Sequence, residues 1–117
     1  MQKMKLFLAV TATVGLLSVN AAAGNADLVK EGEKIFNTKK IGNCLACHAV
    51  NGKNIDNPGN LGPKLQGLAM WPEQALYDKV YNPYTTNPIS AMPPFGLNGV
   101  LDDHQIKAVV AYLKTVK

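Results

Sequence analysis

The chain has 117 residues, of which 47% are hydrophobic, and this length predicts one small domain. Its formal net charge is +4, and its twelve basic residues are all lysines scattered along the sequence. This distribution argues against nucleic-acid binding, for which a dense basic stripe that includes arginine is typical.

The first 23 residues have the order of charge and hydrophobicity that is typical of a secretory signal peptide. Two lysines precede an apolar run over residues 6–19, and three alanines follow at 21–23. The run is shorter than the ~20 residues that a membrane-spanning helix needs, so a retained anchor is the less favoured alternative. We expect export to the periplasm and cleavage before Gly24, with Asp27 as an alternative start. The mature domain is then 24–117, without a membrane span.

Two segments in the first two thirds of this domain are predicted to be helical. Residues 27–36 place apolar side chains on one helical face, and Gly32 among them indicates close approach by another helix. Pro72 suits the first turn of a second helix over residues 73–81, which the pair Asn82-Pro83 ends.

The clearest helix signal lies near the C-terminus. Asp102 and Gln105 have the spacing of a capping box, and Leu101 and Ile106 are placed to pack across it as a hydrophobic staple. An apolar stripe continues from there to Leu113. We therefore predict that a helix begins directly after Asp102.

No segment alternates convincingly between apolar and polar residues, so we predict an all-α domain. Its short helices are joined by long loops over residues 42–65 and 84–99, which are rich in Gly, Asn and Pro. A domain of about ninety residues built in this way has a thin core. A large apolar cofactor at its centre would complete that core.

The segment Cys44-Leu45-Ala46-Cys47-His48 has the C-x-x-C-H spacing of c-type haem attachment. Two thiols add across two vinyl groups of one haem ring, and the histidine that follows supplies an axial ligand to the iron. A thioredoxin-like disulfide would need βαβ surroundings, and a zinc site would need four ligands where the chain has two Cys and two His. We therefore predict one covalently attached haem c, bound by Cys44 and Cys47, with His48 on the iron.

The second axial ligand has three candidates in the mature domain, namely Met70, Met92 and His104. Met92 is favoured because two prolines follow it at once, and a stiff loop can hold a thioether against iron at low entropic cost. Methionine–histidine ligation raises the haem potential and suits electron transfer. Alternatively, Met70 and Met92 are ordinary core residues, and His104 is an ordinary exposed surface residue.

Pro63, in the segment Leu61-Gly62-Pro63, is a candidate for a supporting role. A ligating imidazole usually donates its other N–H to a carbonyl or carboxylate, which fixes the ring and tunes its basicity. The carbonyl of Pro63 is the candidate acceptor for His48. Without a haem motif upstream, an ordinary Gly-Pro turn would be the preferred interpretation.

These features together resemble the class I cytochrome c family across the whole mature chain. The first and last helices, the Cys44–His48 motif, Leu61-Gly62-Pro63 and a late methionine follow one another in the family's order. The string Met92-Pro93-Pro94-Phe95-Gly96 resembles the corresponding segment of the SoxX family. SoxX proteins are the small cytochrome subunits of the SoxAX complex of bacterial thiosulfate oxidation.

The resemblance implies an all-α fold around one haem, with Pro63 bonded to His48 and Met92 as the distal ligand. It further implies a heterodimer with a larger SoxA-type cytochrome subunit and a downstream electron acceptor. The complex would join thiosulfate to a cysteine of a carrier protein, as an L-cysteine S-thiosulfotransferase. Because both cysteines belong to the haem motif, we expect no catalytic residue of this chain's own.

Two other functions stay open at this point. The first is a freely diffusing class I cytochrome c that carries electrons to an oxidase or reductase. The second is a ligand-binding or sensing haem protein, which needs a vacant or labile sixth position on the iron.

Overall fold

The computed structural model describes residues 17–55 and 57–117, with side chains from residue 25 onward in the first helix. Most of the expected signal peptide therefore lies outside the described residues. The described residues form three α-helices: α1 (Leu17–Asn37), α2 (Glu73–Tyr81) and α3 (Asp103–Leu113). Three short 3-10 helices accompany them: η1 (Cys44–Ala46), η2 (Leu68–Met70) and η3 (Pro83–Thr85).

The prediction of an all-α fold is confirmed. The described residues form no strand, and their β-type pairing is an isolated parallel bridge between Val50 and Leu65. That bridge holds together the two ends of the loop after the cysteine motif. None of the helices in the described part is both long and apolar enough to cross a membrane.

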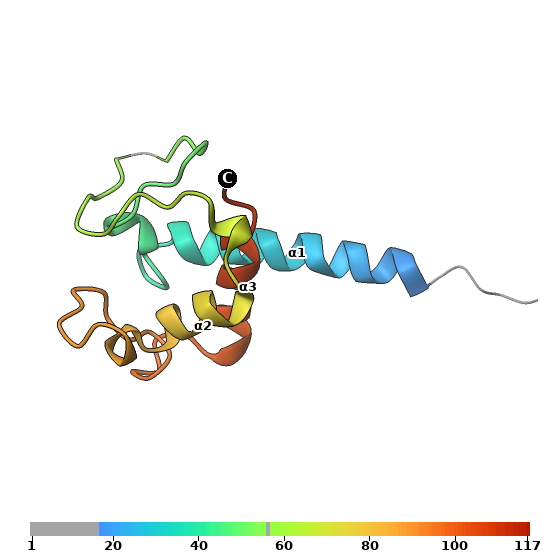
Figure 1. The fold of residues 1–117 in the computed structure, drawn as a ribbon. Coiled ribbons are helices and arrows are strands. Elements are labelled where there is room, and N and C mark those ends of the chain that lie inside the picture. Colours follow the sequence, from blue (N-terminus) through green and yellow to red (C-terminus); the bar gives the residue numbers. More distant parts are fainter. Residues whose placement is uncertain (1–16, 56) are drawn as a thin grey trace, which may run out of the picture.

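Helix α1 is longer than the sequence pattern indicates, because it begins at Leu17 and not near residue 27. Its N-terminal half extends away from the rest of the molecule (Figure 1). The apolar periodicity over residues 27–36 identifies only the half that packs against other elements. The preceding residues include three alanines and no proline, which is compatible with a helix that begins earlier.

Helices α1 and α3 cross at close range. A Cβ added at Gly32 would lie 2.5 Å from the carbonyl carbon of Ala108 and 2.9 Å from the Cβ of Tyr112. Phe36 packs edge-on against Tyr112, with ring centroids 5.4 Å apart and planes at 63°. The expected close approach at Gly32 is thus confirmed, and only a glycine fits there without displacing the backbone of α3.

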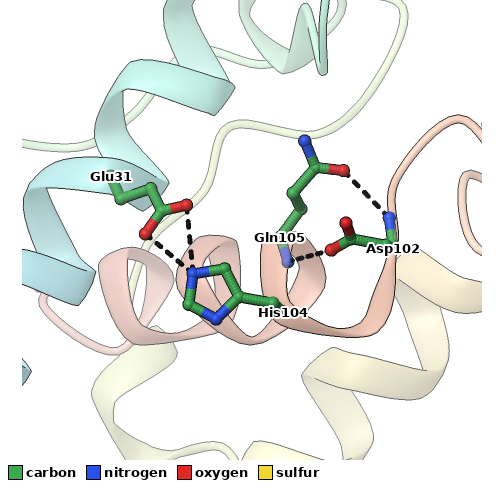
Figure 2. Close-up of polar contacts among 4 residues, drawn as sticks. All are labelled: Glu31, Asp102, His104 and Gln105. Atoms are coloured by element: carbon green, nitrogen blue, oxygen red, sulfur yellow. Dashed lines mark hydrogen bonds and ion pairs between the residues drawn. The ribbon is translucent and has the colours of Figure 1, made fainter.

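Helix α3 begins with the predicted capping box (Figure 2). The Asp102 carboxylate accepts a hydrogen bond from the Gln105 backbone N–H at 2.8 Å, and the Asp102 N–H donates to Gln105 Oε1 at 2.9 Å. Leu101 and Ile106 are both buried, as expected of the staple across this box. In the first turn of the helix, His104 Nε2 lies 2.9 Å from a carboxylate oxygen of Glu31, which links α3 to α1 (Figure 2).

Candidate haem site

The two cysteines and His48 lie on a single tight turn. Asn43 adopts a left-handed conformation with φ of 52°, and the 3-10 helix η1 begins directly after it. The backbone N–H groups of Cys47 and His48 both donate to the Cys44 carbonyl, at 3.1 and 3.0 Å. This turn gathers three positions of the motif on one side, where all three side chains line the same cavity.

The orientation of His48 is fixed by the residues that follow in the loop. His48 Nδ1 lies 2.7 Å from the carbonyl oxygen of Pro63, as expected from the sequence. A carbonyl can only accept, so Nδ1 carries the hydrogen, and Nε2 of the neutral ring keeps its lone pair for a metal. Gly62 lies flat against the imidazole, since a Cβ there would be 2.8 Å from both ring nitrogens.

The loop that carries Pro63 is itself tied to the cysteine turn. The Gly59 N–H donates to the Leu45 carbonyl and the Gly62 N–H to the Cys47 carbonyl, each at 2.9 Å. A Cβ at Gly59 would collide with the carbonyl of Ala46. These contacts make the turn and the loop one unit, so the imidazole is held on both sides by backbone.

Met92 lies in the wall of the same cavity, and neither of the other ligand candidates does. Met70 is 88% exposed, and His104 is bonded to Glu31 on the α1–α3 crossing. The Met92 backbone is held by Ser90, whose hydroxyl accepts from the Met92 N–H at 3.1 Å. The structure thus brings together the predicted site residues Cys44, Cys47, His48, Pro63 and Met92.

The cavity has a volume of about 570 Å³, within the range of cofactor pockets. Its walls include buried core side chains from all three helices, among them Phe36, Leu76, Val80, Val109 and Leu113. It therefore opens into the centre of the core. An apolar chamber with two free thiols, an imidazole nitrogen with a free lone pair, and a thioether fits a haem ring and its iron.

Burial controls the protonation state of the Cys44 thiol. It raises the pKa of this thiol to about 12, so the thiol is protonated at neutral pH. Within residues 17–55 and 57–117, no group of three or more His, Cys, Asp or Glu side chains is arranged to hold a metal ion.

Several cavity residues carry no local sequence signal. Trp71, Lys79 and Asn87 line the cavity because α2 and the segment after it fold over the cysteine turn. Lys79 is an exposed residue of α2 that follows the buried Leu76 by three positions, so helical spacing from that apolar residue is the one signal that points to it.

A protein-family model described as cytochrome c oxidase, cbb3-type, subunit III matches residues 27–113. The chain belongs to this cytochrome c family. The matched segment spans the cysteine turn, the Pro63 loop, Met92 and all of α3. It starts at the point in α1 where packing against α3 begins.

A comparison with solved structures gives a more specific likeness. The crystal structure of SoxXA from P. pantotrophus matches with a TM-score of 0.66 and 31% sequence identity, over 74% of this chain and 79% of that one. The chain is therefore a SoxX-like, haem-binding c-type cytochrome, and the fold expected from the sequence is confirmed.

A curated relative, an uncharacterized lipoprotein of Aquifex aeolicus (strain VF5), is 38% identical over 91 residues. The aligned part is 74% of this SoxX-like chain but 44% of the relative. The chain thus spans less than half the length of the curated relative that it matches.

Proposed function

We propose that this chain is a periplasmic, monohaem c-type cytochrome that serves as the electron-transfer subunit of a SoxAX-type L-cysteine S-thiosulfotransferase complex. The observation that carries the proposal is the convergence of Cys44, Cys47, His48 and Met92 on one apolar cavity, in a chain similar to the SoxX part of a SoxXA complex. The larger partner would be a SoxA-type cytochrome.

Each site residue has a definite task in this proposal. Cys44 and Cys47 would hold the haem through thioether bonds, and His48 and Met92 would coordinate its iron. The bound haem would supply one-electron exchange. The Pro63 carbonyl keeps the His48 ring in place and leaves its Nε2 free for the metal. With Met92 as a ligand, the iron would have no open position for a substrate.

This assignment places the sulfur chemistry on the partner subunit. Joining thiosulfate to a carrier cysteine releases two electrons, and a single haem accepts one at a time, so a second centre is needed. Both cysteines of this chain are used by the haem, so neither can carry sulfur as a nucleophile. The chain then takes electrons from the partner and passes them to a downstream acceptor.

Co-purification from the periplasm of the native host tests the proposal. We expect a larger c-type cytochrome to remain bound in fixed ratio through size exclusion, with thiosulfate-dependent activity in the same fraction. The intact mass should match one covalent haem on a chain that begins at Gly24 or Asp27. A haem protein of monomer size that is inert with thiosulfate would contradict the subunit assignment.

The family description names a subunit of an oxidase, which connects this family with electron delivery to oxidases and leaves a second candidate open. In this alternative the same site serves a freely diffusing carrier that delivers electrons to an oxidase or reductase. Rapid electron delivery by the isolated monomer to a terminal oxidase, together with no reaction with thiosulfate, would favour this candidate over the first.

A further inference from the structure

The charge on the cavity wall is unbalanced. Two lysines, Lys64 and Lys79, line the cavity, and none of the acidic residues in the described part of the chain does. The ion pairs among the described residues join His104 to Glu31 and Lys107 to Asp103, so neither cavity lysine has an acidic partner there. The cavity wall therefore presents uncompensated positive charge to whatever occupies it.

Of the two lysines, Lys79 is the one whose ammonium group is held in place. Its Nζ donates a hydrogen bond to Thr86 Oγ1 at 2.6 Å, and that hydroxyl donates in turn to the Pro83 carbonyl at 3.3 Å. Pro83 is buried and lines the cavity. This chain of contacts fixes the Lys79 charge to the segment that continues to Met92.

We propose that the ammonium group of Lys79, held in place by Thr86, raises the reduction potential of the bound haem. The inference rests on the proposed function, since it requires a haem in the cavity. Reduction adds one electron, supplied by the partner cytochrome, to the iron and neither forms nor breaks a bond. The centre thereby loses one unit of positive charge, so a fixed cation nearby favours the reduced state.

The low polarity of the surrounding wall strengthens the effect. Lys79 itself is exposed, but the neighbouring Leu76, Val80 and Pro83 are buried, so part of its field on the cavity side passes through protein and not through water. Neutralisation of a haem carboxylate by the same ammonium group would act in the same direction. The Lys79 ammonium group therefore raises the reduction potential whether it stays unpaired or pairs with a haem carboxylate.

A redox titration of purified holoprotein tests the inference. At a fixed applied potential we expect Lys79→Gln to shift the oxidised-to-reduced ratio by roughly three- to tenfold toward the oxidised form, as for a unit charge at moderate effective dielectric. Lys79→Arg should retain most of the wild-type potential. Thr86→Val, which frees the ammonium group, should produce a smaller shift in the same direction.

Lys107→Gln is the matched control, because it removes one positive charge from a residue that lies outside the cavity and is paired with Asp103. It should leave the ratio within about twofold of wild type. Equal potentials for Lys79→Gln and Lys107→Gln would overturn the inference. A shift with Lys64→Gln but none with Lys79→Gln would also overturn it.

Haem spectra separate this inference from the proposed function. If wild type and Lys79→Gln both contain covalent haem and show a methionine-ligated spectrum, the haem site is intact in both. The measured reduction potential then decides whether Lys79 has the proposed role. Loss of the methionine-ligated spectrum in both Lys79→Gln and Lys79→Arg would show a structural role and overturn the inference. A wild-type protein without covalent haem would refute the proposed function and the inference with it.

Discussion

At His48 a single backbone carbonyl decides which ring nitrogen is available to a metal. The 2.7 Å contact to Pro63 assigns the hydrogen to Nδ1, and Gly62 leaves room for the ring to lie flat against the backbone. The two hydrogen bonds from Gly59 and Gly62 to the cysteine turn carry this restraint back to the motif itself. A local sequence of three residues thus fixes the position and the tautomer of the proximal ligand.

Met92, which lines the same cavity, is the proposed second ligand of the haem iron. We expect Met92→Ala to lower the haem midpoint potential by on the order of 0.1 V, because axial-ligand identity sets haem potentials over roughly 0.8 V. The reduced variant should also bind carbon monoxide, which the wild type should bind weakly. A spectroelectrochemical titration and a carbon monoxide difference spectrum measure the two effects.

Met70→Ala is the control for this experiment, because Met70 is 88% exposed and does not line the cavity. Its spectrum and potential should match those of the wild type. An unchanged spectrum in Met92→Ala would show that another side chain is the ligand. Strong carbon monoxide binding by the wild type would instead support a sensing function.

Among the secondary-structure elements, the crossing of α1 and α3 is the structural base of the site. Phe36 at the end of α1 and Val109 and Leu113 on α3 belong both to the packed core and to the cavity wall. A shift of one helix against the other would therefore change the shape of the cavity. The glycine at the crossing sets the distance between the two helices.

Gly32→Ala should destabilise the fold by about 1–3 kcal/mol, because the new methyl group would meet backbone atoms of Ala108 that cannot rotate away. The gain in helix propensity, at most ~1 kcal/mol, offsets only part of this cost. Denaturant unfolding followed by circular dichroism gives the difference. Lys30→Ala, at an exposed position of α1, is the control and should stay within ~0.5 kcal/mol of wild type.

Local chemistry explains which elements could be predicted from the sequence. Pro72 and Asn82-Pro83 bracket α2 at its observed bounds, and the Asp102–Gln105 capping box gives the start of α3. The start of α1 could not be predicted, because the apolar stripe that indicates a helix begins only near residue 27, whereas the helix begins at Leu17.

The same distinction applies to the site. The cysteine motif, Pro63 and Met92 carry local signals, namely fixed spacing or adjacent prolines, and the structure places all of them on one cavity. Trp71 and Lys79 belong to the wall only because α2 folds over that cavity, a long-range arrangement that no short pattern encodes. The hydrogen bond from Lys79 to Thr86 likewise depends on how the segment after α2 turns.

For the whole molecule, the largest consequence is that the cofactor would replace part of a hydrophobic core. Figure 1 shows the segment around residues 50–65 and the segment around residues 83–95 on either side of the C-terminal end of α1. Both segments contribute to the cavity wall, and neither contains an α-helix. Their mutual packing therefore depends on what lies between them.

We expect a Cys44→Ala/Cys47→Ala variant purified without haem to lose cooperative folding. Without haem, the core side chains that line the cavity of about 570 Å³ lose their packing partner and face water. The variant should show a shallow thermal transition by circular dichroism and should bind a hydrophobic dye. Met92→Ala, which keeps both thioether bonds, should still melt cooperatively. A sharp transition of the haem-free double variant within a few degrees of the holoprotein would show that the polypeptide alone forms a sufficient core.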